Sequence, residues 1–227
     1  SIKPSQNVNK LTTSEKILLK DKMKSLNMLT VRPEIVDADI IDILVTTNFK
    51  YNPRATTKTT SELETLVRAA IITHDTDNLS GFDSIFRHSN LLKDIDGAED
   101  SILSNITTVK LRKTISPTLN QSLGYTVELG SGNSFYNPHS GHNAMAGGVI
   151  STTGFKVSGY TDTFYFDDDG KGNLRRYSFT GSNRIYADSQ AGTVDYANGK
   201  IVANGVIITE TENTDDTIHF TIIPSSY

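Results

Sequence analysis

The sequence predicts an α+β protein, with a small helix and strand region followed by an antiparallel, β-rich region of sandwich or barrel type. Apolar residues at helical spacing occur only in the first 119 of the 227 residues. Of the 16 glycines, 14 lie after position 120. From there to the end, short alternating strands are separated by turn residues, a spacing typical of sandwiches and barrels. We therefore predict two subdomains, residues 1–119 and 120–227.

The first region begins with a helix and a strand. Thr12 and Glu15 form a capping box, in which a hydroxyl and a carboxylate satisfy free amides at a helix start. Pro33 prevents the helix from continuing. A strand is predicted over residues 39–49, and its apolar residues lie on both faces. That pattern predicts burial between two layers.

Two more helices and a second strand complete this region. Thr59 and Glu62 form a second capping box. The helix that follows has an apolar stripe made of Leu63, Leu66, Val67, Ala70 and Ile71. A shorter helix is predicted from Phe82, and a strand over residues 106–111. The unit therefore has the order β-α-α-β.

The second region is predicted to be strands and turns. A strand over 125–129 is followed by a glycine-rich loop from Gly130 to Gly148, longer than most connections in compact domains. The later strands are predicted at 150–157, 163–166, 174–179, 184–186, 193–197, 201–202, 206–211 and 217–223. Asn198-Gly199 predicts a type I′ hairpin turn, which needs two successive residues at positive φ.

Composition and charge exclude several classes of partner. Residues 1–119 hold 16 basic and 15 acidic residues, whereas residues 120–227 hold 6 and 11. Nucleic acid is not an expected partner, because phosphate binding needs a basic face. No run of 18 apolar residues occurs, so no membrane contact is expected. The absence of cysteine excludes disulfides and thiolate metal sites.

Two motifs have some features of metal sites. The run from Asp167 to Asn173 resembles a calcium loop, but neither possible frame places ligands at positions 1, 3, 5 and 12. We interpret it as a solvated hairpin tip. His139 and His142 have the spacing of a zinc pair but no third ligand beside them. The sequence therefore predicts no metal and no cofactor.

No catalytic set is predicted. The stretch from Gly130 to Phe135 begins like a dinucleotide fingerprint but lacks its third glycine and opens no helix. No Gly-x-Ser-x-Gly elbow occurs, and Asp42 points away from the face that Asp37 and Asp39 share on a strand. No small-molecule substrate is therefore expected.

Arginines and tyrosines alternate in the second region. Arg175, Arg176 and Arg184 are interleaved with three tyrosines, Tyr177, Tyr186 and Tyr196. Stacking on single-stranded nucleic acid is one use of such a pattern, but the acidic balance opposes it. Tyrosine and arginine are also enriched at protein interfaces, which is the interpretation adopted here.

The second region resembles a known family. The segments are 173–177 (NLRRY), 181–186 (GSNRIY), 191–196 (AGTVDY) and 199–201 (GKI). They resemble the C-terminal part of a baseplate wedge protein of large contractile-tailed phages (myoviruses). Val31-Arg32-Pro33, the strand over 39–49 and the helix after Thr59 resemble more loosely the baseplate J-like family.

The resemblance implies a structural subunit of the virion, a late viral protein located in the tail baseplate and assembled in the host cytoplasm. It implies a homodimer that also binds other wedge proteins, builds the ring around the tail tube, and keeps or rearranges these contacts when the tail contracts. It implies no enzyme activity. Two alternatives are a glycan-binding, adhesin-like tail module and a metal-dependent carbohydrate-active β-domain that uses the loop from Gly130 to Gly148.

This long loop is the predicted interaction surface. A glycine-rich loop loses much conformational entropy when it becomes ordered, so contacts with a neighbouring subunit are expected to fix it. Aromatic groups and methionine are suited to such contacts. The predicted contact residues are Phe135, Tyr136, His139, His142 and Met145. The competing interpretation is a loop that packs on its own domain.

Overall fold

The computed structural model describes residues 13–24, 40–81, 84–129, 136–140 and 148–225. The chain divides into two compact units, Ser1–Ile41 and Asp42–Tyr227. In the first unit, helix α1 (Thr13–Lys24) confirms the helix expected there, whereas its predicted capping residue Thr12 lies outside the described residues. The division between residues 119 and 120 stays a prediction.

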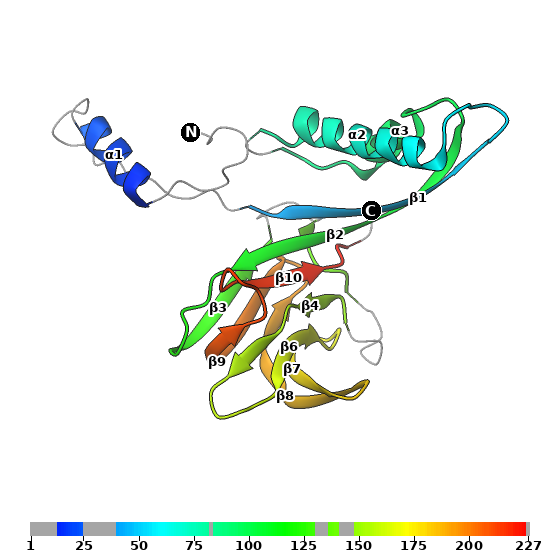
Figure 1. Cartoon of the computed structure of the whole chain (residues 1–227). Coiled ribbons are helices and arrows are strands. Elements are labelled where there is room, and N and C mark those ends of the chain that lie inside the picture. Colours follow the sequence, from blue (N-terminus) through cyan, green and yellow to red (C-terminus); the bar gives the residue numbers. More distant parts are fainter. Residues whose placement is uncertain (1–12, 25–39, 82–83, 130–135, 141–147, 226–227) are drawn as a thin grey trace. The chain divides into compact units, whose positions relative to one another are not determined.

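The first part of the second unit is the predicted β-α-α-β module. Strands β1 (Asp42–Tyr51) and β2 (Ile102–Ile115) form an antiparallel pair, with Val45 opposite Val109. Between them in sequence come helices α2 (Thr60–Asn78) and α3 (His88–Asp96). Both helices lie over one face of the strand pair (Figure 1).

Helix α2 forms where the sequence predicts it. The Thr59 hydroxyl accepts a hydrogen bond from the Glu62 amide at 3.3 Å, and the Glu62 carboxylate accepts one from the Thr59 amide at 2.7 Å. Both halves of the capping box are thus present. The predicted stripe faces inward, with Leu63 and Val67 buried. Helix α3 begins later than predicted, at His88.

The module has its own core. Its buried members are Val67, Phe86, Leu91, Ile95, Ile102 and Val109. Ile43, Val45 and Phe49 of β1 pack against this cluster from the sheet. The opposite face of the sheet is open, because Thr46, Asn48 and Lys50 are exposed. The prediction that this strand is buried between two layers is therefore wrong, because among the described residues of this unit helices pack on one face of the strand and leave Thr46, Asn48 and Lys50 exposed.

Five strands close a barrel after this module (Figure 1). They are β5 (Phe155–Val157), β6 (Thr163–Asp168), β7 (Asn173–Thr180), β8 (Asn183–Asp195) and β9 (Lys200–Thr211). The pairs β5–β6, β6–β7, β7–β8, β8–β9 and β9–β5 complete a circle. Strand β9 makes the closure, since its first residues pair with β8 and its last with β5.

Strands outside the barrel join it to the module. Strand β3 (Ser122–Glu128) pairs with β9. Strand β4 (Ile150–Thr152) pairs with β6 and with β10 (Ile218–Ile222), and β10 pairs with the end of β2. The sequence predicted either a sandwich or a barrel, and the strand order is that of a barrel. The separately predicted strands 184–186 and 193–197 are one strand, as are 201–202 and 206–211.

The hairpin between β8 and β9 is confirmed, but its turn type is not. Asp195 pairs with Lys200, so four residues connect the strands instead of two. Gly199 has φ +63°, whereas Asn198 is not at positive φ, so the turn is not type I′. The reason is local. The Asp195 carboxylate accepts hydrogen bonds from the amides of Ala197 and Asn198. These bonds make the chain turn directly after Asp195, before the predicted turn at Asn198-Gly199.

Candidate interaction surface

The described part of the predicted interaction loop is bonded to its own domain. The His139 amide donates to the Ile223 carbonyl at 3.0 Å, and the Asn137 side chain donates to the Ala197 carbonyl at 2.5 Å. Tyr136 and His139 are half-buried here. Phe135, His142 and Met145 lie outside the described residues. Whether these five residues contact a neighbouring subunit stays a prediction.

The three consecutive aspartates of β6 and its turn serve three different purposes. Asp167 and Asp168 are fully buried. Because successive residues of a strand point to opposite faces, they bind different partners. Asp169 accepts hydrogen bonds from the amides of Lys171 and Asn173 and shapes the turn. The prediction of a solvated tip is therefore wrong for the first two aspartates.

Asp168 ties the barrel to the segment before β4. Its carboxylate accepts from the amides of Val149 and Ile150, both at 2.8 Å, and from the Tyr196 hydroxyl at 2.5 Å. Burial and this bond to a carboxylate raise the pKa of Tyr196. Each donor satisfies an acceptor that would be costly to leave unpaired in the interior. This arrangement is structural.

Asp167 binds two arginines on the opposite face of β6. Arg175 Nε lies 2.9 Å from one carboxylate oxygen, and Arg184 Nη1 lies 2.7 Å from the other. The Tyr186 hydroxyl also donates to this carboxylate, at 2.9 Å. Burial raises the pKa of Asp167, while these donors lower it. The network holds the arginines in fixed positions, since a buried charge without partners is strongly unfavourable.

Aromatic rings extend this network across three strands. Tyr165, Tyr177 and Tyr186 are opposite one another in the register of β6, β7 and β8. The Tyr165 and Tyr177 rings are stacked at 5.6 Å, and the Arg184 guanidinium lies 4.6 Å from the centre of the Tyr177 ring. Phe179 packs edge-on against both tyrosines at 5.4 Å.

We call this surface the tyrosine–arginine face. It consists of Tyr165, Arg175, Tyr177, Phe179, Arg184 and Tyr186. Part of it is open to solvent, because Phe179 is 46% and Tyr186 39% exposed. Solvent-open aromatic and arginine side chains held in place by packing are the groups that dominate binding energy at protein interfaces.

Sequence reasoning found part of this face. It grouped Arg175, Arg184, Tyr177 and Tyr186, and the structure brings these four together. It also grouped Arg176 and Tyr196, which the structure separates from them. Arg176 points to the other side of β7, over the Phe164 ring at 5.3 Å, and Tyr196 bonds to Asp168.

Two members of the surface were missed. Tyr165 and Phe179 belong to it, and the signal that could have found them is the period-two alternation along each strand. On β7 this alternation places Arg175, Tyr177 and Phe179 on one face. On β6 it places Tyr165 with Asp167.

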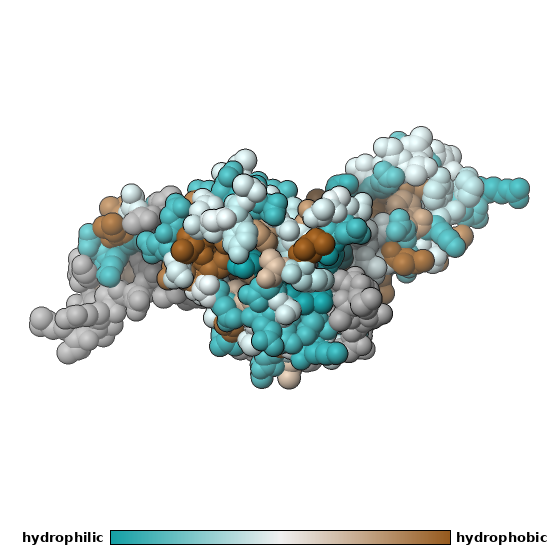
Figure 2. Space-filling view, turned by 90° about the horizontal axis from the view of Figure 1, so that it is seen from below, coloured by the Kyte–Doolittle hydropathy of each residue, from teal (hydrophilic) through white to brown (hydrophobic). Residues whose placement is uncertain are grey.

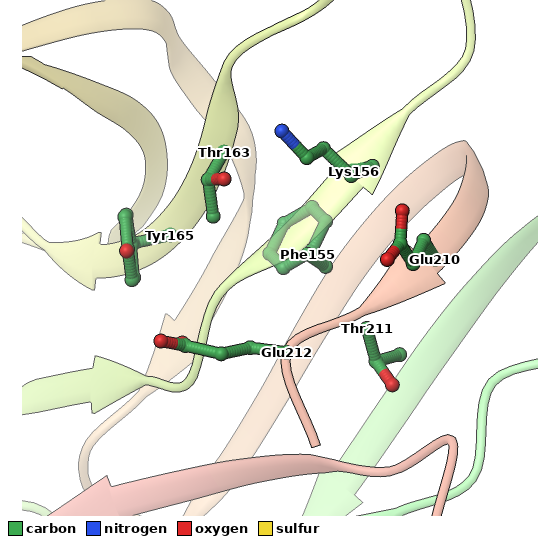
Figure 3. A pocket seen from close by; sticks show the side chains of 7 residues that line it. All are labelled: Phe155, Lys156, Thr163, Tyr165, Glu210, Thr211 and Glu212. Atoms are coloured by element: carbon green, nitrogen blue, oxygen red, sulfur yellow. The ribbon is translucent and has the colours of Figure 1, made fainter. Parts of the chain in front are cut away.

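An open pocket of about 210 Å³ adjoins this face (Figure 3). Its lining is Phe155 and Lys156 of β5, Thr163 and Tyr165 of β6, Glu210 and Thr211 of β9, and Glu212. Tyr165 therefore belongs to both the face and the pocket. Glu212 accepts a hydrogen bond from the Gly154 amide at 2.7 Å, and burial together with the charge of Glu212 raises the pKa of Tyr165.

The described residues contain no group of three or more histidine or acidic side chains placed to hold a metal ion. Within these residues, no helix has the length and hydropathy that a membrane span requires. Both arginines of the tyrosine–arginine face and the Tyr186 hydroxyl bind the buried Asp167 carboxylate. The face therefore presents fixed charges and aromatic rings.

Residues 39–114 match the family model of baseplate structural protein gp6, C-terminal domain III. This segment is accordingly similar to a viral baseplate structural protein, a component of the tail of a phage virion. More particularly, the family that the segment matches is that of the gp6 baseplate wedge protein. A search of the curated proteins found no match.

The matched range coincides with the β-α-α-β module, which runs from Asp42 to Ile115. It covers 76 of the 227 residues, about a third. It falls on the region whose resemblance was the looser one. The stretch from Asn173 to Ile201, which carried the closer resemblance, lies outside it.

Proposed function

We propose that this chain is a wedge component that self-associates as a homodimer and binds other wedge proteins to build the ring around the tail tube. The observation that carries the proposal is the family match on a module with its own core. A baseplate structural protein acts through association with other baseplate proteins. No catalytic role is part of this function.

The open side of the module supports self-association. Among the described residues, β1 pairs with β2 alone, so its other edge presents free amide and carbonyl groups. Ile106 of β2 is 67% exposed on the sheet face that the helices leave uncovered. On the face drawn in Figure 2, hydrophilic surface predominates and hydrophobic residues form separate patches. The proposed contact surface is therefore a patch on this face and not the whole face.

The test is the molar mass of the full chain by light scattering over a range of concentrations. We expect a dimer with an interface of roughly 1,000 Å² or more, the size of specific contacts. Ile106→Lys should weaken dimerisation at least about tenfold, since a charge would then have to be buried. Ile72→Lys, at an exposed position on α2, is the matched control and should change nothing. A chain that remains monomeric at high micromolar concentration contradicts the homodimer.

The long loop has its own test. Replacing Phe135 and Tyr136 together by serine should leave the folding of the isolated chain nearly intact and weaken self-association or incorporation into wedges. The reason is that aromatic side chains at a contact surface contribute to binding more than to the fold. A double variant that assembles normally and melts much lower indicates that the loop belongs to the core of its own domain.

A further inference from the structure

The pocket beside the tyrosine–arginine face has an unbalanced charge. Glu210 is exposed, and within the described part of the chain no hydrogen bond or ion pair engages it. Lys156, its opposite neighbour on β5, donates instead to the Thr161 carbonyl at 2.8 Å. Glu212 carries a second carboxylate at the same opening. The lining therefore carries two carboxylates and one ammonium group, which leaves a net negative charge.

The walls of the pocket are suited to a flat cation. One face of the Tyr165 ring is stacked on Tyr177, and this contact fixes the orientation of the ring at the side of the pocket. In Figure 3, Glu212 extends towards Tyr165, and Glu210 lies on the other side of the Phe155 ring. A guanidinium group both stacks on aromatic rings and pairs with carboxylates in a fork geometry, which an ammonium group cannot do.

The size of the pocket limits what it can hold. Pockets for drug-sized ligands are about 300–1,000 Å³, and this one, at about 210 Å³, is smaller. It has room for a single long side chain. The exposed rings of Phe179 and Tyr186 on the adjoining face would contact the chain on which that side chain is carried.

We propose that this pocket binds an arginine side chain of another baseplate protein, with the guanidinium between Glu210 and Glu212 and against the Tyr165 ring. The inference rests on the proposed function, because it names the chemistry of the partner. The partner segment is extended, presents its arginine to the pocket, and lays its apolar neighbours on the tyrosine–arginine face. Charge complementarity makes this a contact of defined orientation.

The direct test uses the full chain and two peptides that differ in one group. The peptide Gly-Gly-Arg-Gly-Gly is titrated while amide NMR signals are recorded, and the same peptide with uncharged citrulline is the control. We expect the signals of Lys156, Tyr165 and Glu210 to shift, with a dissociation constant on the order of 1–10 mM, the scale of one charged and stacked group. The citrulline peptide should bind at least about tenfold more weakly.

Variants test whether the amide NMR shifts arise from binding in the pocket. Glu210→Gln with Glu212→Gln should abolish the shifts, and because glutamine still accepts a hydrogen bond from the Gly154 amide, the fold should be kept. The matched control is Glu64→Gln with Glu128→Gln, which removes the same two charges elsewhere and should bind as the parent does. Equal binding of both peptides, or shifts that survive in the pocket variant, overturns the proposal. Shifts caused by chitotriose or maltotriose at these residues, with none from the arginine peptide, would reveal a glycan site instead.

Assembly separates this inference from the proposed function. We expect the parent chain to co-purify with wedge proteins and the pocket variant to do so at least about tenfold less. A pocket variant that assembles like the parent leaves the proposed function standing and removes the arginine pocket from it. A parent chain that assembles with no wedge protein contradicts the proposed function, and the peptide titration then decides on the pocket alone.

Discussion

At the scale of single residues, the turn between β8 and β9 depends on Gly199 for two separate reasons. Its φ of +63° lies in the left-handed region, which side chains rarely adopt. A Cβ atom at this position would also lie 2.6 Å from Asn137 Oδ1 and 3.1 Å from the Leu129 carbonyl oxygen. The glycine therefore allows the segment around Asn137 to pack on the turn.

We predict that Gly199→Ala destabilises the fold by roughly 1–3 kcal/mol, the scale of backbone strain, with the steric conflict adding to it. Gly181→Ala is the matched control, because Gly181 has φ +62° and a Cβ there would meet open space. Chemical denaturation of both variants gives the difference. If the two variants lose the same stability, the close contact with Asn137 has no energetic weight.

Asn198 provides a second prediction at this scale. From the sequence, Asn198→Asp would be neutral, because Asp-Gly and Asn-Gly suit the same type I′ turn. The structure reverses this expectation. The Asn198 side-chain amide donates to Asp195 at 2.7 Å, and this bond comes first among those that lower the pKa of Asp195. A carboxylate at position 198 would lose the donor and repel Asp195.

We therefore expect Asn198→Asp to lower the melting temperature at pH 7 and to cost less at pH 3, because protonation at low pH reduces the repulsion between the two carboxylates. Asn198→Ser, which removes the amide without adding charge, is the control and should show a smaller pH dependence, because only the donor to Asp195 is lost. Thermal melts at the two pH values measure the effect. Equal melting of parent and Asp variant at pH 7 would show that this contact is weak.

At the scale of elements, helix α2 is fixed by its first turn. The Thr59 and Glu62 groups satisfy amides that would otherwise lack partners. The hydrogen bonds from Thr59, backbone first, lower the pKa of Glu62. A carboxyl group with a lowered pKa in the folded state stabilises the fold above its unfolded pKa of about 4.3. That contribution is lost as the pH falls through the folded pKa.

We predict that Thr59→Ala destabilises the protein by about 1 kcal/mol, the usual cost of losing a threonine cap. The variant should also lose part of the acid sensitivity of the parent, because Glu62 then has fewer donors. Denaturation of both proteins at pH 7 and pH 3 measures this. A Thr59→Ala variant with the same loss of stability at both pH values shows that the carboxylate does not take part.

The elements show how far sequence patterns reach. The capping box and the stripe from Leu63 to Ile71 are local signals, and both are confirmed. The stripe ends in buried His74, whose Nδ1 lies 2.6 Å from Asp94 Oδ2, and an apolar criterion misses such a residue. The partners of Asp167 and Asp168 were also missed, because no local pattern states which distant tyrosine will meet a carboxylate.

Which face of a strand is buried is harder to predict than the presence of the strand. Residues 39–49 are apolar on both sides, yet in the described part of the chain one side is exposed at Thr46, Asn48 and Lys50, since the number of layers is decided by the rest of the chain. For the same reason, the sequence predicted four of the six members of the tyrosine–arginine face and missed Tyr165 and Phe179. Alternation along β7 is visible in the sequence, whereas the neighbour strand that brings Tyr165 beside Tyr177 is not.

At the scale of the whole molecule, the β-α-α-β module and the barrel are held in one sheet by strand β10. Residues Ile218 to Ile222 pair with residues Leu111 to Ile115 of β2 on one side and with β4 on the other. Ile218, Phe220 and Ile222 are buried. Strand β10 is thus the link between the module and the barrel.

We predict that Phe220→Ala destabilises the protein by roughly 3–5 kcal/mol, the range for removing a buried aromatic ring. Its effect should reach both parts, so that hydrogen exchange accelerates in β2 as well as in β6. Ile223→Ala is the matched control, because Ile223 follows β10 and is 42% exposed. Faster exchange confined to the barrel would indicate that the module is stable without this link.

The pairing of β2 with β10 also determines when the protein can finish folding. The two strands are about a hundred residues apart in sequence, and closing so long a loop is slow compared with forming local contacts. During synthesis, the helices and β1 can pack on β2 early. The last residues of β2 stay unpaired until β10 has been synthesised. Until then this edge is open to other strands. A chain truncated before Ile218 would lack β10 and leave that edge of β2 permanently free, so that aggregation would compete with assembly.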